Sequence, residues 1–396
     1  MTARPDDHEQ QRVMKNWTKL AAYALLLLMI GSCVDPYRPS QIEAPNQYLV
    51  VDGFLNGGTG NSVIKLSRTQ NLGNTTKPAA EARATIQVEG GTGETFPFVE
   101  SAAGTYTLTA TTLPIGKSYR VRIKTQVGGE YLSDPITIKQ TPKIDSLNWA
   151  VRNDGLQIYV NTHDPANKTR YYRWEYEDTF EIRTPYESQF DFVNSKVVMR
   201  TSPPVNHCWR TQSSTAILLG TSARLTDDVL QRAPLLFIPG SSPKLWIKYS
   251  LMVKQYAQSQ EAYAYWENLQ KTTEQLGGLF DPLPSQVGGN LHSLTNPTEP
   301  VLGFLDGYTT EQIRVFIDRP LELSFNLLQT GYENCKLDTI PTPGVPPQPL
   351  SAYLGQGGGY VAIKELKPGS QYLATGTHCA DCRDIGTTTR PSFWPQ

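Results

Sequence analysis

The sequence predicts a mainly β protein, in which an N-terminal immunoglobulin-like sandwich is followed by a larger β-rich, fibronectin-like domain with one long helix. Three observations favour this class over a helical bundle. Short alternating runs of apolar and β-branched residues recur along the chain. Turn-forming clusters separate these runs, as at 56–58, 90–93 and 128–129. The 396 residues include 31 Gly, 29 Pro and 20 Tyr, a composition typical of strands joined by turns.

Residues 47–140 predict the first sandwich. About seven short strands with regularly spaced turns are typical of an immunoglobulin-like fold. The expected strands cover 47–55, 62–67, 84–89, 95–99, 104–110, 118–124 and 131–138. The chain lacks the Cys-Trp-Cys spacing of antibody domains, so the prediction is limited to the sandwich architecture.

Residues 141–396 predict the second domain, which follows a hinge at 140–145. The early strands are expected to form a fibronectin-like core that later strands elaborate. The expected strands cover 147–151, 155–160, 170–177, 180–182, 196–200, 215–219, 235–238, 245–256, 301–305, 312–317 and 321–325. The C-terminal segment ends in aromatic residues and is expected to pack back onto the domain.

One helix interrupts the strands at about 259–277. Its apolar positions recur at helical spacing and predict one buried stripe, formed by Ala262, Trp266, Leu269, Thr273 and Leu276. Glu261 is placed in the first turn, where the helix dipole favours an acid, and Gly277 is placed to end the helix. Glu267 and Lys271 have the i,i+4 spacing of a surface ion pair.

The start of the chain resembles a secretory leader. The apolar run Leu20–Ile30 follows Lys15 and Lys19 and is shorter than the about 20 residues that a membrane-spanning helix needs. It leads into Gly31, Ser32 and Cys33, which together with Ile30 resemble a bacterial lipobox. We therefore predict a signal peptide at 1–32 with its true start possible at Met14, acylation of Cys33, and a lipidated tether at 33–46.

The other four cysteines predict disulfides. Cys208, Cys335, Cys379 and Cys382 form an even set in a chain that is predicted to be exported. Three complete pairings are possible, and the sequence does not choose among them. A metal site that also uses His378 or His207 is the less favoured alternative, because Cys208 and Cys335 lack the paired spacing of a zinc site.

Charge and motifs exclude several classes of function. A formal net charge of −1 offers no basic field for nucleic acid. The sequence has no G-x-S-x-G, H-E-x-x-H or phosphate-binding glycine loop. His163, His207, His292 and His378 are scattered, and a wet helix face explains Glu274 better than a carboxylate pair with Asp281. We expect no catalytic residue, no cofactor and no enzymatic activity.

Aromatic residues gather in the strand expected at 170–177. Alternation places Tyr172, Trp174 and Tyr176 on one face, which predicts core or an interface rather than a sugar-stacking platform. The opposite face carries Tyr171, Arg173, Glu175 and Glu177 and is expected to face solvent.

Several segments resemble one known family. They are 208–209, 249–256, 261–266, 278–282, 289–290, 301–304, 379–383 with Gly386, and 390–394. They are similar to Bacteroidetes outer-membrane lipoproteins of domain-of-unknown-function family 4249. The resemblance implies an exported lipoprotein, commonly encoded beside a TonB-dependent outer-membrane receptor, and supplies no activity or ligand.

These observations lead to a functional hypothesis. The protein is expected to be anchored to the outer membrane by lipid and to act as a binding or accessory subunit of a TonB-dependent receptor in cargo capture or uptake. The alternatives are a surface hydrolase acting on glycan or peptide, and a purely structural surface lipoprotein. The ligand, the oligomeric state and the membrane face, periplasmic or external, stay open.

Overall fold

The computed structural model describes residues 47–70, 76–109, 111–274, 288–319, 330–341, 348–355 and 358–395. All of these residues belong to one compact unit. The predicted signal peptide, Cys33, the tether and the strand expected at 321–325 lie outside the described residues. Within the described part, no helix has the length and apolar character needed to cross a membrane.

The fold is mainly β, as predicted. The elements, in chain order, are β1 (Leu49–Asn56), β2 (Ser62–Arg68), β3 (Thr85–Gly90), β4 (Thr95–Pro97), β5 (Val99–Ala102), β6 (Thr105–Leu108), β7 (Ser118–Lys124), β8 (Glu130–Ser133), β9 (Ile136–Thr137), β10 (Ile144–Arg152), β11 (Gly155–His163), β12 (Tyr171–Arg183), β13 (Phe190–Val193), β14 (Lys196–Met199), β15 (His207–Ser213), β16 (Leu218–Thr221), β17 (Val229–Pro239), β18 (Lys248–Ala257), α2 (Gln260–Thr273), β19 (Leu291–Ser293), β20 (Asp306–Tyr308), β21 (Thr310–Asp318), β22 (Asp338–Ile340), β23 (Tyr360–Lys367) and β24 (Gln371–Gly376).

The first sandwich consists of two sheets with a shared core. One sheet has the order β20-β1-β2-β6-β5, and the other has the order β19-β8-β7-β3-β4 with β9 beside β7. Alternate residues of β7 are buried, as expected of a strand with one face on a core. Its Val121 and Ile123 join Ile64, Val88 and Tyr106 in one hydrophobic cluster.

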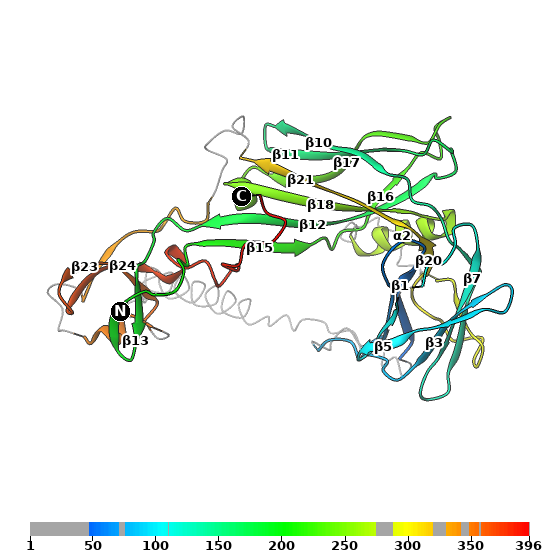
Figure 1. Cartoon of the computed structure of the whole chain (residues 1–396), viewed down its shortest axis with the longest axis horizontal. Coiled ribbons are helices and arrows are strands. Elements are labelled where there is room, and N and C mark those ends of the chain that lie inside the picture. Colours follow the sequence, from blue (N-terminus) through cyan, green and yellow to red (C-terminus); the bar gives the residue numbers. More distant parts are fainter. Residues whose placement is uncertain are drawn as a thin grey trace, which may run out of the picture. The chain divides into compact units, whose positions relative to one another are not determined.

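Two strands of this sandwich come from much later in the chain, which corrects the domain boundary predicted at residue 140. The β20 strand pairs in parallel with β1, with Phe54 opposite Asp306, and Figure 1 shows it beside β1. The β19 strand pairs with β8. Leu291 and Leu305 enter the first core. The strand expected at 301–305 makes only an isolated bridge, from Leu302 to Val50.

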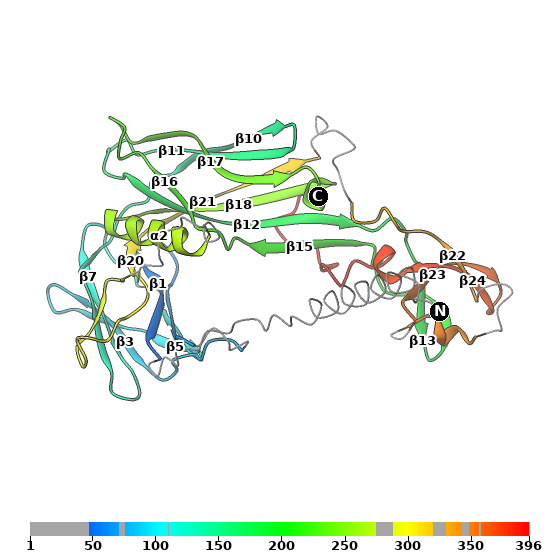
Figure 2. The same cartoon turned by 180° about the vertical axis from the view of Figure 1, so that it is seen from behind.

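The second sandwich packs a three-stranded sheet against a longer one. The first has the order β10-β11-β17, and the second has the order β15-β12-β18-β21 with β16 beside β12. Figures 1 and 2 show these long strands as two adjacent layers. Ile158 and Val160 from one layer and Leu251 and Val253 from the other belong to the same hydrophobic cluster.

The aromatic face of β12 forms core. Tyr172 and Trp174 are 0% and 1% exposed, and Tyr176 packs against the same hydrophobic cluster. Tyr172 and Trp174 therefore present no surface to a partner, which excludes the interface alternative for these two side chains. The core alternative holds for them because the second sheet covers this face.

The predicted helix is α2. Ser259 caps its N-terminus by accepting a hydrogen bond from Ala262 N–H, and Glu261 lies in its first turn. Lys271 Nζ lies 3.0 Å from a Glu267 carboxylate oxygen, so the predicted i,i+4 pair is confirmed. Of the predicted stripe, Ala262 is buried and Thr273 is exposed. Gly277 lies outside the described residues.

The C-terminal region adds strands that the sequence did not predict. The sheet β22-β24-β23 packs with the β13–β14 hairpin around a third, smaller hydrophobic cluster. The chain end packs back as predicted, because Trp394 is 7% exposed and meets Phe316 edge to face, with ring centroids 5.6 Å apart.

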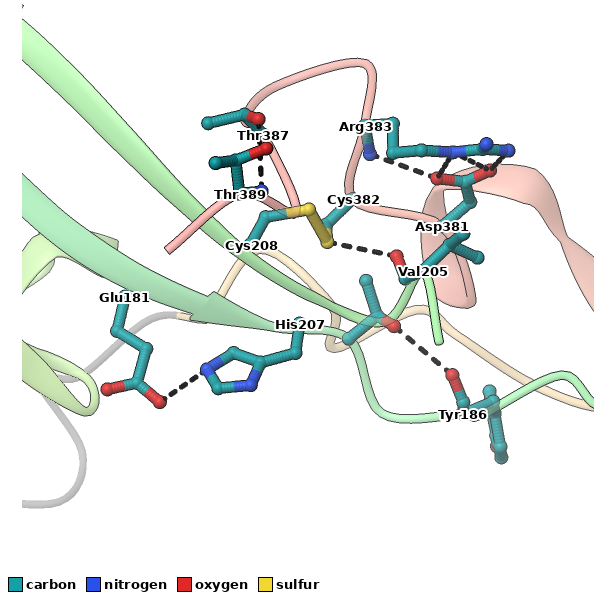
Figure 3. The surroundings of a disulfide bond; sticks show 11 residues. Glu181, Tyr186, Val205, His207, Cys208, Asp381, Cys382, Arg383, Thr387 and Thr389 are labelled. Carbon is teal, nitrogen blue, oxygen red and sulfur yellow. Dashed lines mark hydrogen bonds and ion pairs between the residues drawn. A yellow bond between two sulfur atoms is a disulfide. The ribbon is translucent and has the colours of Figure 1, made fainter. Parts of the chain in front are cut away.

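The four predicted cysteines form two disulfides, Cys208–Cys382 and Cys335–Cys379. Neighbouring Cys379 and Cys382 thus bond to different partners. Figure 3 shows the first bridge, where Cys382 Sγ lies 3.0 Å from the Val205 carbonyl oxygen.

His378 lies beside the second disulfide. Its Nε2 is 3.3 Å from Cys379 Sγ and 3.8 Å from Cys335 Sγ, so these three side chains group as metal ligands would. Both sulfur atoms are used by the disulfide and are not available as thiolates. This geometry agrees with the disulfide interpretation that the sequence favoured.

Candidate functional site

A cavity of about 910 Å³ lies beside the predicted hinge. Three segments form most of its wall, namely residues 138–143, which overlap the predicted hinge, the turn at 163–171, and residues 258–260, which lead into α2. Ile115, Gly116, Asp145 and Glu311 complete it. Its volume is in the range of small-molecule sites in proteins.

Gln255 anchors the structure next to this cavity. It is fully buried at the end of β18. Its Oε1 accepts a hydrogen bond from Trp174 Nε1 at 2.8 Å. Its Nε2 donates to the Pro142 carbonyl oxygen at 2.8 Å and to Thr162 Oγ1 at 2.9 Å. This amide is satisfied at both ends and links the hinge to the second sandwich.

Gln258, three residues later in the chain, lines the cavity. Unlike Gln255, it has a side-chain amide that is not satisfied within the described structure. Its side chain is 4% exposed, and its backbone N–H donates to the Tyr171 carbonyl oxygen at 2.8 Å. Its side-chain Nε2 and Oε1 have no hydrogen-bond partner among the described residues. An unpaired buried polar group costs about 1–3 kcal/mol, so this amide requires an explanation.

Several charged side chains around the cavity are compensated within the protein. Lys139 Nζ lies 2.9 Å from Asp306, and Arg170 donates to the carbonyl oxygens of Leu225 and Thr226 at 3.2 and 3.1 Å. Asp164 accepts three backbone N–H groups, from Ala166, Lys168 and Thr169. Burial opposes the charge of Asp164, but these hydrogen bonds lower its pKa overall.

Asp145 and His163 form an ion pair on the cavity wall. His163 Nδ1 lies 2.8 and 3.0 Å from the two carboxylate oxygens. The hydrogen bond to Asp145 raises the pKa of His163 and so favours its charged form. Within the described part of the chain, the hydrogen bonds of the His163 ring run only to Asp145. The pair resembles half of a catalytic triad, but among the described residues no hydroxyl or thiol nucleophile hydrogen-bonds the His163 ring.

We expect Asp145→Asn to lower the pKa of His163 towards its ordinary value. The pair stabilises the fold fully below the ordinary histidine pKa and loses that effect as pH rises through the raised pKa, because the partner charge then disappears. An NMR titration of the His163 ring resonance measures the shift. Asp134→Asn, which changes an aspartate beside His292, is the control and is expected to leave His163 unchanged. An unaltered His163 pKa in Asp145→Asn would contradict the assignment.

The site residues predicted from sequence are separated in the structure. The cysteines form two bridges away from the cavity, Tyr172 and Trp174 lie in the core, and Cys33 lies outside the described residues. Gln258 was not predicted. Its only sequence signal is its position between a strand pattern and the capping Ser259, which does not show whether the side chain has partners.

Fold and cavity together define a β-sandwich protein with a cavity in whose wall several charged side chains are paired within the protein. The chain belongs to the family described as Domain of unknown function (DUF4249), which matches residues 34–314, more than half of its length.

Comparison with solved structures gives distant similarities. One is a protein of Bacteroides uniformis to which carbohydrate binding has been ascribed. It has 10% sequence identity and a TM-score of 0.15, with coverage of 54% of this chain and 91% of the other. Another is chitinase ChiA74 from Bacillus thuringiensis, with 10% identity, a TM-score of 0.15 and coverage of 51% and 29%. At these scores neither similarity bears on function. A search of the curated proteins gave no match.

Proposed function

We propose that this protein is an exported binding protein, attached to the outer membrane through acylated Cys33, that serves a TonB-dependent receptor as an accessory subunit in cargo capture or uptake. The observation that carries the binding role is the cavity of about 910 Å³ with the unpaired, buried amide of Gln258 in its wall. A protein that keeps such an amide at a cost in stability gains from a ligand that pairs with it.

Two further observations support export and anchoring. The leader ends in Ile30-Gly31-Ser32-Cys33, which resembles a lipobox. The four remaining cysteines are all paired in disulfides, as is typical of proteins in oxidising compartments. The tether at 33–46 contains three prolines and would hold the sandwiches away from the lipid surface.

We expect Cys33→Ala to abolish acylation and to release the protein from the membrane or leave it as an uncleaved precursor. Stable anchoring needs more than one acyl chain, and this variant would carry none. Labelling with a palmitate analogue, followed by membrane fractionation, measures both effects. Ser32→Ala, which keeps a small residue before the cysteine, is the control and is expected to stay acylated. A Cys33→Ala protein that is still acylated and membrane-bound would refute the anchor.

The receptor partnership is tested by purification from the native membrane. The tagged full-length chain is purified from solubilised outer membrane after mild cross-linking, with Cys33→Ala as the comparison. The proposal expects a large β-barrel receptor to co-purify with the anchored protein and to be depleted with the variant. Repeated recovery of the anchored protein without such a receptor would overturn the partnership.

A further inference from the structure

Two glutamines of one short segment have opposite hydrogen-bond states. Gln255 and Gln258 are 0% and 4% exposed. Every polar side-chain atom of Gln255 has a partner, whereas neither polar atom of Gln258 has one within the described ranges. The two side chains are buried to a similar extent. They differ in hydrogen bonding, because only the Gln258 amide is left without partners among the described residues.

We propose that the cavity binds a neutral, hydroxyl-rich small molecule of the sugar class, and that Gln258 recognises it by donating one hydrogen bond and accepting another. This inference rests on the proposed binding function and names the ligand class of that cavity. An amide presents a donor and an acceptor side by side, which matches two adjacent hydroxyl groups.

The charges of the wall favour a neutral ligand. The strongest anion-binding group near the cavity, the Arg170 guanidinium, already donates to backbone carbonyls. Lys139 is held by Asp306. Two carboxylates of the wall are also engaged, since Asp145 binds His163 and Asp164 binds three backbone N–H groups. The other charged side chains of the wall, exposed Lys143 and Lys168 and half-buried Glu311, are of both signs, so the wall presents no field of a single sign.

The backbone around the cavity favours a hydroxyl-rich ligand over a peptide. An extended peptide is usually bound by free N–H and C=O groups of a strand edge. Here backbone groups at the wall are already paired. Gln258 N–H bonds to the Tyr171 carbonyl, Lys139 N–H to the Gly307 carbonyl, and Asp164 N–H to the Asp228 carbonyl. Recognition is left to side chains, and the Tyr171 ring and Pro142 supply apolar surface for the C–H groups of a sugar.

The buried amide links binding to stability. Its polar atoms are buried in this structure, so recognition as proposed requires the Gln258 side chain to rotate towards the cavity. Binding then satisfies a group that is unpaired in the free protein. Replacing Gln258 by leucine removes this unpaired group at similar volume and is expected to stabilise the free protein.

The test compares Gln258→Leu with Gln255→Leu in the full-length protein in detergent. We expect Gln258→Leu to raise the Tm by about 2–4 °C and Gln255→Leu to lower it, because only the second substitution leaves Trp174, Pro142 and Thr162 without their partner. A Tm that falls in Gln258→Leu would overturn the inference, since the amide would then be satisfied in the free protein, for example by water.

Ligand class is measured with defined probes. Thermal shift and calorimetry are run with neutral trisaccharides (malto-, xylo-, manno- and chitotriose), with trialanine as the peptide arm and citrate as the anion arm. We expect a trisaccharide to stabilise the wild type and to bind Gln258→Leu about tenfold or more weakly, from the loss of two hydrogen bonds.

The outcomes separate this inference from the proposed function. Gln258-dependent binding of trialanine or citrate alone would overturn the ligand class while supporting a binding cavity. The absence of any Gln258-dependent binding would overturn the inference. The receptor and anchoring proposals are judged separately by co-purification and acylation.

Discussion

Replacing Cys208 and Cys382 together by alanine is expected to lower the free energy of unfolding by about 4–5 kcal/mol. The bridge joins residues 174 positions apart, and closing so long a loop removes much of the conformational entropy of the unfolded chain. Both cysteines are fully buried, and each contributes to the core of the second sandwich. Urea denaturation of the double variant, followed by tryptophan fluorescence, measures the loss.

The second disulfide provides the matched comparison. Cys335 and Cys379 are 44 positions apart, so their double alanine variant is expected to lose about 1 kcal/mol less. Equal losses in the two variants would show that loop length does not decide the ranking. A loss below about 2 kcal/mol at Cys208 and Cys382 would contradict the structural role of that bridge.

Arg173→Ala is expected to lower the free energy of unfolding by about 3–5 kcal/mol. This is the second of the two large effects that we expect. The guanidinium lies 4.4 Å from the centre of the Trp266 ring of α2 and 4.9 Å from that of Tyr256 of β18. It also donates to Glu175 at 2.8 Å and to the Tyr308 hydroxyl of β20 at 3.4 Å. Burial raises the pKa of Tyr308 to about 12, so this hydroxyl stays protonated at neutral pH.

The cost in Arg173→Ala comes from packing, from the two ring contacts and from the partners left behind. Thermal and urea unfolding measure it. Arg173→Met keeps most of the volume and is expected to lose clearly less than the alanine variant. Arg224→Ala, at an exposed turn, is the control and is expected to change stability by no more than about 0.5 kcal/mol. A loss in Arg173→Ala no larger than in this control would contradict the role of Arg173.

The sequence pattern correctly predicted the strands and the helix that depend on interactions between residues close together in the chain. Alternation located β2, β3, β7 and β12, because each strand turns one face towards a core. The helix was predicted from spacing and its N-terminal residues, and α2 begins one residue after the capping Ser259. The predicted Glu267–Lys271 pair formed because residues four apart share a helix face.

Features that depend on contacts between distant parts of the chain were not predicted from the sequence pattern. The face of β12 that carries Arg173 was expected to face solvent, yet the Arg173 side chain is only 13% exposed because Trp266 and Tyr256 cover it. Charge alone did not indicate burial, since a guanidinium can be buried against aromatic rings. Short β22 and the irregular β23–β24 pairing carry little alternation. Gln258 was not identified because an unpaired amide is defined only by its surroundings.

The parallel pairing of β1 with β20 has a consequence for how the chain is made. Synthesis proceeds from the N-terminus, so β1 exists for about 250 residues of elongation before Asp306–Tyr308 arrives to cover its free edge. An uncovered edge strand readily pairs with a neighbouring chain. The nascent polypeptide therefore has an unpaired, aggregation-prone β1 edge until β20 has been synthesised. A fragment that stops at residue 140 would keep this edge unpaired permanently.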